Sequence, residues 1–342
     1  MACFTVERAG LFTTVQDQGR PGYQRYGVPV GGALDAESLL IANALVGNPA
    51  DAAALELRFL GPQLRIEADS VLVALAGTST ALVVDGVTRA VLPANRSARL
   101  RRGDVLDVAT LRDSATAYLA VAGGIAVAPV LGSRSTSVSG GFGGFGGRKL
   151  VDGDEVPLAS DAAPELPPRA LRHAPFARKP TLHVVLGPQD DMFTAEAIAT
   201  FLGSTYTVSH EADRMGIRLD GPEIAHISSY NIISDGIASG AIQVPGSRQP
   251  IVLLADRQTT GGYPKIAAVI SSDIAACGRL RPGDKVRFAA VSIEEAENRA
   301  RAHASLMREL VAKIAAGEES AIDLEALYSQ NLISGVVGDY DA

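Results

Sequence analysis

The feature of this sequence that most constrains its fold is an internal repeat. ELRFLGPQL at residues 56–64 aligns with GIRLDGPEI at residues 216–224, at an offset of 160 residues (216 minus 56). A short helical pattern followed by glycine precedes each copy, at residues 36–46 and 195–202. A repeat of this length indicates two related structural units along the chain.

A second pair of segments supports the repeat. KLVDGDEVPL at residues 149–158 matches RLRPGDKVRF at residues 279–288, and the Gly-Asp turn between apolar runs predicts a β-hairpin in both. The offset is now 130 (279 minus 149), so the first half carries about 30 extra residues, which we place around residues 83–107 as additional strands. The alternative is coincidence, because β proteins reuse glycine turns freely.

Composition favours strands over helices. Hydrophobic residues make up 47% of the 342 residues, 35 residues are glycine and tryptophan is absent, so the cores are filled mainly by Val, Leu, Ile and Ala. Such a chain favours many short strands joined by glycine turns. We therefore predict a mainly β protein with a few helices, long enough for two domains.

Proline marks the expected boundary between the halves. Residues 161–180 contain five prolines, which disfavour helix and suit a linker. We predict a first domain at 1–162, a Pro-rich linker at 163–180, a second domain at 181–291 and a helical extension at 292–342. In the extension, Ser292 and Glu295 form a capping box that opens a helix through about Ile314, packed on the second lobe or on a neighbouring subunit. The tail after it is expected to add one short helix.

Charge and cysteine content exclude several functions. A formal net charge of -7 argues against nucleic-acid and anionic-membrane surfaces. The two cysteines, Cys3 and Cys277, are far apart, which predicts neither a zinc site nor a disulfide framework and fits a reducing cytosol. The sequence has neither an 18-residue apolar stretch nor a secretory pattern at its start, so we expect a cytoplasmic protein.

Cofactor motifs are equally sparse. The histidines show no metal-binding spacing, no Met-Lys dipeptide offers a biotin target, and no phosphate-binding P-loop occurs, so we expect no metal and no covalently bound cofactor. The glycine run at residues 140–147 contains G-x-G-x-x-G, but a strand pattern follows it instead of the helix that a dinucleotide site needs. We predict a mobile loop that borders a cleft.

The most polar strand end lies within residues 243–265, QVPGSRQPIVLLADRQTTGGYPK. An apolar strand delivers five hydrogen-bonding side chains and then a glycine turn with a lysine, whereas the matching segment of the first half, residues 117–125, is apolar throughout. This asymmetry favours a ligand loop over a hydrated strand exit. Its candidate residues are Gln243, Pro245, Asp256, Arg257, Gln258, Thr259, Thr260, Gly261, Gly262, Tyr263 and Lys265.

Three further places contain arginines with two interpretations each. In residues 16–33, Asp17 and Arg20 either bind a ligand or brace one another. Arg134 and Arg214 either hold a carboxylate bidentately or make structural ion pairs.

These motifs together resemble the allophanate hydrolase subunit 2 family, over about residues 4 to 290. The resemblance is carried by VQDQGRPGYQRYGVPVGGALDAES, IANALVGN, YLAVAGGI, LGSRST, RMGIRLDGP and AIQVPGSRQPIVLLADRQTTGGYPKIAAVISSD. It implies two tandem cyclophilin-like β-barrel domains. It also implies association with a B subunit of the allophanate hydrolase subunit 1 family and, in 5-oxoprolinase, with an A subunit.

The family contains the C subunit of 5-oxoprolinase, the Kip antagonist proteins and part of urea carboxylase. The resemblance therefore implies the opening of 5-oxo-L-proline to L-glutamate, with ATP used by partner subunits. The alternatives are a carboxyltransferase that takes a carboxyl group from visiting carboxybiotin to a urea-like amide, and a non-catalytic module that binds a homologue of the B subunit. For the lactam reaction, the hypothesis is that Gln258 or Gln243 pairs with the amide and Lys265 polarises its carbonyl. Asp256 orients the lysine or manages a proton, and Arg257 or Arg134 holds the carboxylate.

Overall fold

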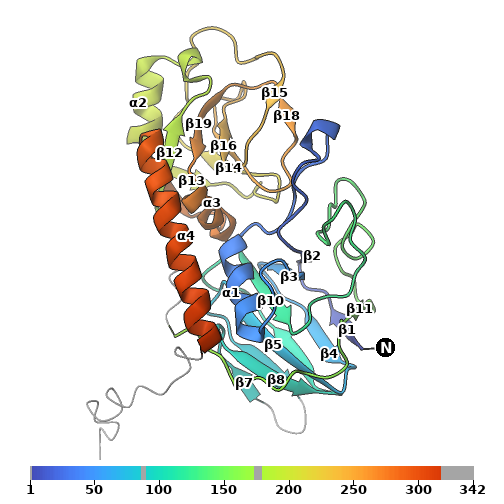
Figure 1. Ribbon diagram of the computed structural model, residues 1–342. Coiled ribbons are helices and arrows are strands. Elements are labelled where there is room, and N and C mark those ends of the chain that lie inside the picture. Colours follow the sequence, from blue (N-terminus) through green and yellow to red (C-terminus); the bar gives the residue numbers. More distant parts are fainter. Residues whose placement is uncertain (1, 86–89, 173–178, 317–342) are drawn as a thin grey trace, which may run out of the picture.

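The computed structural model describes residues 2–85, 90–172 and 179–316, and these form 20 strands and four α-helices. Figure 1 shows two β-rich lobes, one above the other, with a long helix along one side. The predicted mainly β fold with tandem lobes is confirmed.

Two sheets build the first lobe. The order across one sheet is β11 (Glu155–Pro157), β1 (Cys3–Arg8), β4 (Gln63–Ile66), β9 (Val105–Val108), β6 (Leu82–Asp85) and β7 (Ala90–Leu92). The order across the other is β2 (Phe12–Gln16), β3 (Ala54–Arg58), β10 (Thr116–Val121), β5 (Ser70–Ala76) and β8 (Ser97–Arg101). Strands therefore occupy the region around residues 83–107, as expected.

The second of these sheets is covered on both faces. Successive strand residues point to opposite faces, so Leu55 and Leu119 enter the core of the lobe while Ala54 and Tyr118 face helix α1 (Ala36–Val46). Because of this double cover, every residue of β3 and β10 is buried, including two charged residues of β3.

A closed barrel forms the second lobe. Its strands follow the order β12 (Thr181–Leu186), β19 (Lys265–Val269), β16 (Ala241–Gln243), β17 (Ile251–Leu253), β14 (Gly216–Asp220), β13 (Tyr206–Val208) and β20 (Lys285–Ala290). A separate ribbon pairs β15 (Asp235–Gly236) with β18 (Thr260–Gly261). Helices α2 (Ala195–Gly203) and α3 (Ser271–Arg279) complete the lobe.

The prediction of β-hairpins at residues 149–158 and 279–288 is wrong, although the structure has a Gly-Asp turn at both positions. In each, glycine has a positive φ (87° at Gly153, 88° at Gly283), and the following aspartate accepts a 2.8 Å hydrogen bond from the backbone N–H three residues earlier. The strands that leave these turns pair elsewhere, β11 with β1 and β20 with β12 and β13. A Gly-Asp turn here starts a strand, and distant strands supply the partners.

The long helix α4 (Ile293–Ala316) joins the two lobes. Ser292 Oγ accepts the Glu295 N–H at 3.1 Å, which confirms the capping box. The helix contacts α3 and β12 of the second lobe and α1 of the first, where Met307 and Ile314 are buried. It therefore packs on both lobes, and not on the second alone. Within the described ranges, no helix combines the length and apolar composition needed to span a bilayer.

Part of the predicted linker and the predicted tail helix lie outside the described residues. Within the linker, Leu171 donates its N–H to the Asn95 carbonyl at 2.8 Å, and Arg169 Nη1 donates to the Ala44 carbonyl at 3.0 Å. Residues 169–171 therefore lie against the first lobe.

Candidate functional site

The structure divides the polar segment at residues 243–265 between two places. Asp256 lies at the junction of the two lobes, whereas Lys265 belongs to a cluster beside the β15–β18 ribbon.

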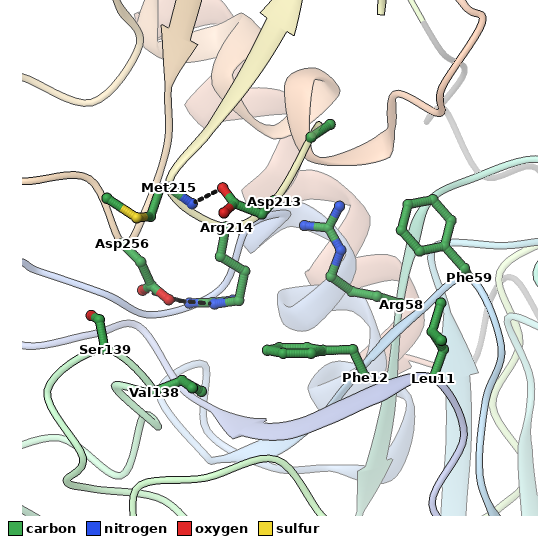
Figure 2. A pocket seen from close by; sticks show the side chains of 11 residues that line it. Leu11, Phe12, Arg58, Phe59, Val138, Ser139, Asp213, Arg214, Met215 and Asp256 are labelled. Carbon is green, nitrogen blue, oxygen red and sulfur yellow. Dashed lines mark hydrogen bonds and ion pairs between the residues drawn. The ribbon is translucent and has the colours of Figure 1, made fainter. Parts of the chain in front are cut away.

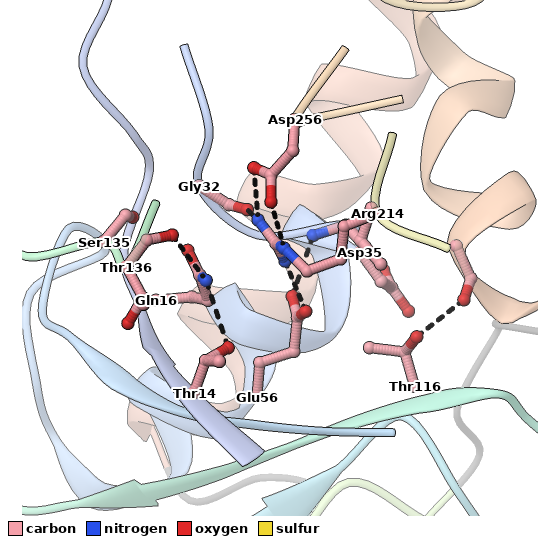
Figure 3. Close-up of polar contacts among 12 residues, drawn as sticks. Thr14, Gln16, Gly32, Asp35, Glu56, Thr116, Ser135, Thr136, Arg214 and Asp256 are labelled. Carbon is pink, nitrogen blue, oxygen red and sulfur yellow. Dashed lines mark hydrogen bonds and ion pairs between the residues drawn. The ribbon is translucent and has the colours of Figure 1, made fainter. Parts of the chain in front are cut away.

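At the lobe junction, Arg214 joins carboxylates from both halves of the chain (Figure 3). It holds Asp256 bidentately, at 2.8 and 3.0 Å, and also donates to Glu56 and to the Gly32 carbonyl. Arg214 is 5% exposed. Burial alone would lower its pKa, but the two carboxylates outweigh that effect and raise it. Arg214 is thus a structural ion-pair partner, the second of its two predicted roles.

The Glu56 carboxylate continues this network into the first lobe. Its Oε2 accepts a hydrogen bond from the Tyr118 hydroxyl at 2.5 Å, and that hydroxyl accepts the Asp35 N–H at 3.0 Å. Asp35 in turn accepts from Arg279 of the second lobe, at 2.6 and 2.8 Å. Two buried arginines of the barrel lobe therefore fix it to the first lobe.

A cavity of about 500 Å³ opens at the same junction (Figure 2). The Arg58 guanidinium faces it without a hydrogen bond among the described residues, and its Nη1 is buried and unpartnered. Burial lowers the pKa of Arg58, against the opposing effect of Glu56. The residues that line the cavity are Leu11, Phe12, Arg58, Phe59, Val138, Ser139, Ala212, Asp213, Arg214, Met215 and Asp256. Val138 and Ser139 come directly before the glycine run, whose own residues 140–147 do not line this cavity.

The second place centres on Lys265. Its side chain is 2% exposed, and its Nζ lies 2.8 Å from Asp235 Oδ2 and 3.4 Å from the Gly236 carbonyl. Gln189 accepts the Lys265 backbone N–H at 3.1 Å and donates to Asp235 at 3.3 Å. The hydrogen bond from Lys265 lowers the pKa of Asp235, whose side chain is 53% exposed. A buried ammonium is therefore held by a carboxylate that solvent reaches.

Two glutamines lie beside this lysine. Gln243 is the cross-strand neighbour of Lys265 in the barrel, and its side chain is almost completely buried. Gln258 is exposed and donates to Gln243 Oε1 at 3.4 Å, while Gln243 donates to the Tyr263 carbonyl at 3.4 Å. A Cβ on Gly261 would lie 2.8 Å from Gln243 Nε2, so the backbone there approaches the amide closely. The structure therefore brings Gln243, Gln258 and Lys265 together.

The hypothesised contact between Asp256 and Lys265 is wrong. Both carboxylate oxygens of Asp256 accept from Arg214, while Lys265 pairs with Asp235. The ion pair with Arg214 holds Asp256 at the lobe junction, and Asp235 takes the place beside the lysine. Whether Asp256 manages a proton stays a prediction.

Arg257 points into the protein. Its Nε donates to the Ile237 carbonyl and its Nη1 to the Leu254 carbonyl, both at 3.1 Å, and burial lowers its pKa. These contacts support a structural role in place of the predicted grip on a carboxylate.

The other members of the segment shape the ribbon through their backbones. Thr259 and Gly262 accept backbone hydrogen bonds from Ile237 and Ile232, at 3.0 and 2.8 Å. Thr260 pairs with Gly236 across the ribbon. Pro245 accepts the Arg248 N–H at 2.9 Å in a neighbouring turn, and Tyr263 is 40% exposed.

Arg134 lies away from both places, on the first lobe. Its Nε donates to the Val127 carbonyl at 3.0 Å, and it borders a separate cavity with Asp51 and Gly124. The predicted carboxylate-holding role of Arg134 gains no support from this placement.

Asp17 lies beside the loop that contains Arg134 and accepts hydrogen bonds from the hydroxyls of Ser133 and Ser135, at 2.6 and 2.5 Å. Asp17 and Arg20 both hydrogen-bond to residues 133–135, and no hydrogen bond joins these two side chains. Arg20 donates to the Ser135 carbonyl and lies 5.0 Å from the Phe142 ring centroid, under the glycine run. The hydrogen bonds of Asp17 with the two serines hold the same loop.

Sequence reasoning missed Glu56, Arg58 and Asp235. The signal for the first two was present, because ALELR at residues 54–58 places two charges in an apolar strand. Buried charges need partners, so such a strand predicts an ion-pair or ligand site. Asp235 follows no apolar strand pattern, and only the ribbon brings it to Lys265.

This chain is similar to proteins of more than one named function. It is 37% identical to the C subunit of 5-oxoprolinase from Escherichia coli, over 84% of this chain and 91% of that protein. It is 32% identical to urea amidolyase of Lachancea kluyveri, over 86% of this chain but 17% of that protein.

A solved structure shows the same fold. The urea amidolyase of Kluyveromyces lactis superimposes with a TM-score of 0.80 at 30% identity, covering 90% of this chain and 20% of that one. The chain thus spans about a fifth of that enzyme. The family model described as carboxyltransferase domain, subdomain A and B, matches residues 26–290. With this match and these identities, the chain belongs to the carboxyltransferase subdomain A and B family.

Proposed function

We propose that this chain is the C subunit of an ATP-dependent 5-oxoprolinase, which opens the lactam of 5-oxo-L-proline to L-glutamate together with partner subunits. One observation carries the proposal: the 37% identity to the E. coli C subunit extends over 84% of one chain and 91% of the other. The Haemophilus influenzae C subunit gives a similar result, at 32% identity over 83% and 89%.

The cluster around Lys265 offers the groups that a lactam needs. A lactam presents one carbonyl acceptor and one N–H donor, and the neighbouring Gln243 and Gln258 side chains carry both kinds of group. Lys265 has three ammonium protons, of which Asp235 and Gly236 accept two. The third is available to meet negative charge that develops on the lactam oxygen during ring opening.

Asp235 takes the orienting role in this arrangement. The hydrogen bond from Lys265 lowers the pKa of Asp235, and its charged carboxylate holds the Lys265 side chain in position. The substrate approaches from the side of Gln258 and Asp235, because these two side chains are exposed while Lys265 and Gln243 are buried.

The surface beside this cluster supports the association with a B subunit of the allophanate hydrolase subunit 1 family. Ile233 is 94% exposed, and Ile227, Tyr230 and Tyr263 are 61%, 48% and 40% exposed. Exposed apolar and aromatic side chains are typical of protein interfaces. A partner docked here would close the lactam site, and the A and B subunits would use the ATP.

Reconstitution tests the proposal. This chain is co-purified with its two partners, the A and B subunits, and lactam-dependent ATP hydrolysis and glutamate release are measured with and without it. We expect both products to depend on all three chains and on 5-oxoproline. Equal turnover from the two partners without this chain would contradict the assignment.

The matches to urea amidolyase favour a second candidate function. Under it, the same amide-binding groups would accept a urea-like amide and a carboxyl group from carboxybiotin carried by a partner. The two candidate functions differ in the partner that they require, because only the second needs a biotin-carrying protein. A streptavidin pull-down from the native host recovers this chain only if such a protein binds it. Recovery together with biotin-dependent carboxylation of urea would favour this function over the lactamase.

A further inference from the structure

The cavity between the lobes is separate from the lactam-binding cluster. Lys265, Gln243 and Gln258 do not line it. Its walls come from Leu11 and strands β2 and β3 of the first lobe and from residues 212–215, just before β14 of the second. A ligand held there would contact both lobes at once.

Arg58 is the one cation facing this cavity whose donors are left without acceptors among the described residues that line it. Arg214 also lines the cavity, but Asp256, Glu56 and Gly32 occupy its donors. Arg58 is 6% exposed and its Nη1 has no partner. Leaving a buried guanidinium donor unpaired is costly, so the site favours an occupant that brings an acceptor.

The acids around Arg58 are already occupied as acceptors. Both oxygens of Glu56 accept hydrogen bonds, one from Arg214 and the other from the Tyr118 hydroxyl and the Leu34 N–H. Asp213 Oδ1 accepts the Met215 and Gly216 N–H groups, at 2.7 and 3.1 Å. Glu56 offsets part of the charge on Arg58, yet no carboxylate in the described part of the chain hydrogen-bonds to its guanidinium.

Apart from Arg58, Ser139, Asp213, Arg214 and Asp256, the side chains of the cavity wall are apolar. Phe12, Phe59 and Met215 supply rings and a thioether, and the side chains of Leu11 and Val138 form exposed edges, at 55% and 41% exposure. Figure 2 shows Arg58 projecting between Phe12 and Phe59, with Met215 and Val138 on the other side of the view. A volume of about 500 Å³ suits a small organic molecule.

We propose that this cavity binds a small organic carboxylate with an apolar body, whose carboxylate accepts hydrogen bonds from the Arg58 guanidinium. Arginine presents paired donors that match a carboxylate. The apolar body packs against Phe12, Phe59 and Met215. Because both lobes contribute, the ligand stabilises their packing and raises the melting temperature of the protein.

Matched pairs of probes test the inference by calorimetric titration of the full chain. The carboxylates are benzoate, 3-phenylpropanoate and hexanoate, and each is compared with its neutral amide. We expect at least one carboxylate to bind about tenfold or more tighter than its amide. We expect Arg58→Gln to abolish the preference for the carboxylate over the amide, and Arg58→Lys to retain part of that preference.

A second variant keeps the test independent of the folding of Arg58→Gln. Leu11 is exposed at the edge of the cavity, so Leu11→Glu places a carboxylate there without disturbing the core. It weakens carboxylate binding about tenfold or more, whereas Val91→Glu, at an exposed position of strand β7, leaves it unchanged. Equal affinity of acids and amides, no binding by any probe, or binding that Leu11→Glu leaves intact overturns the inference.

Discussion

Arg214 and Lys265 are both buried cations of the barrel lobe, but their surroundings differ. Arg214 is enclosed by two buried carboxylates and a carbonyl, so its donors are committed to holding the lobes together. Lys265 has a single carboxylate partner among the described residues, 53% exposed, and neighbours that solvent reaches. Burial of a charge therefore does not by itself identify a reactive site. What matters is whether a donor remains for a substrate.

The largest effect on stability is expected for Arg214→Met. The substitution leaves Glu56 and Asp256 buried without their shared cation, which should lower the free energy of unfolding by about 3 to 5 kcal/mol. Urea denaturation measures the change. As a control, Arg218→Met removes an exposed arginine from the next strand, and its stability should stay near that of the wild type. If the two variants unfold at the same urea concentration, Arg214 does not fix the lobes.

A smaller effect, on activity alone, is expected for Gly261→Ala. The added Cβ would lie 2.7 Å from Ile237 Cδ1 and 2.8 Å from Gln243 Nε2, so both side chains must move. We expect kcat/KM of the reconstituted enzyme to fall about tenfold, because displaced groups lose their alignment with substrate. Gly203→Ala, which meets no atom within 4 Å, serves as the control. Unchanged kinetics for Gly261→Ala would remove Gln243 from the site.

The substitution Asp235→Asn tests whether the ion pair of Lys265 matters less for stability than the ion pairs of Arg214. The Asp235 side chain is exposed, so loss of its charge should change the urea midpoint far less than Arg214→Met does, while turnover falls because Lys265 loses its fixed partner. A destabilisation as large as that of Arg214→Met would show that the Lys265 pair is structural too.

The smallest effect concerns pH. The hydrogen bond from Lys265 depresses the folded-state pKa of Asp235 below its ordinary value of about 3.9. The ion pair between Asp235 and Lys265 therefore contributes its full stabilisation above that pH. This stabilisation is lost as the pH falls through the depressed folded-state pKa of Asp235. Activity assigned to this pair should thus stay constant from neutral pH down to about 4. A fall of activity centred near pH 6 that Asp235→Asn shifts would contradict the lowered pKa of Asp235.

Much of the architecture could be predicted from the sequence. Periodicity and glycine placed the helices at residues 36–46 and 195–202 within a residue of their observed bounds, and Ser292 marked the start of α4. These signals are local, since caps and turns are made by residues three or four apart. The hairpins failed because strand partners are chosen over long distances, as with β11 and β1.

The site was predicted only in part, for the same reason. Gln243, Gln258 and Lys265 belong to one segment, and the structure brings them together. Arg214 meets Asp256 across 42 positions and Glu56 across 158, so neither pairing can be inferred from spacing. Which carboxylate a cation takes depends on tertiary packing, and this is why Asp235, not Asp256, lies against Lys265.

The role of Lys265 is tested most directly by the kcat/KM for 5-oxoproline of the three-subunit enzyme that carries Lys265→Met. We expect a loss of about 100- to 1000-fold, because the variant lacks the donor that meets the developing charge. The matched variant Lys285→Met, which changes an exposed lysine of the same barrel, should retain wild-type turnover. Wild-type kcat/KM for a folded, assembled Lys265→Met enzyme would contradict the claim that Lys265 acts on the substrate.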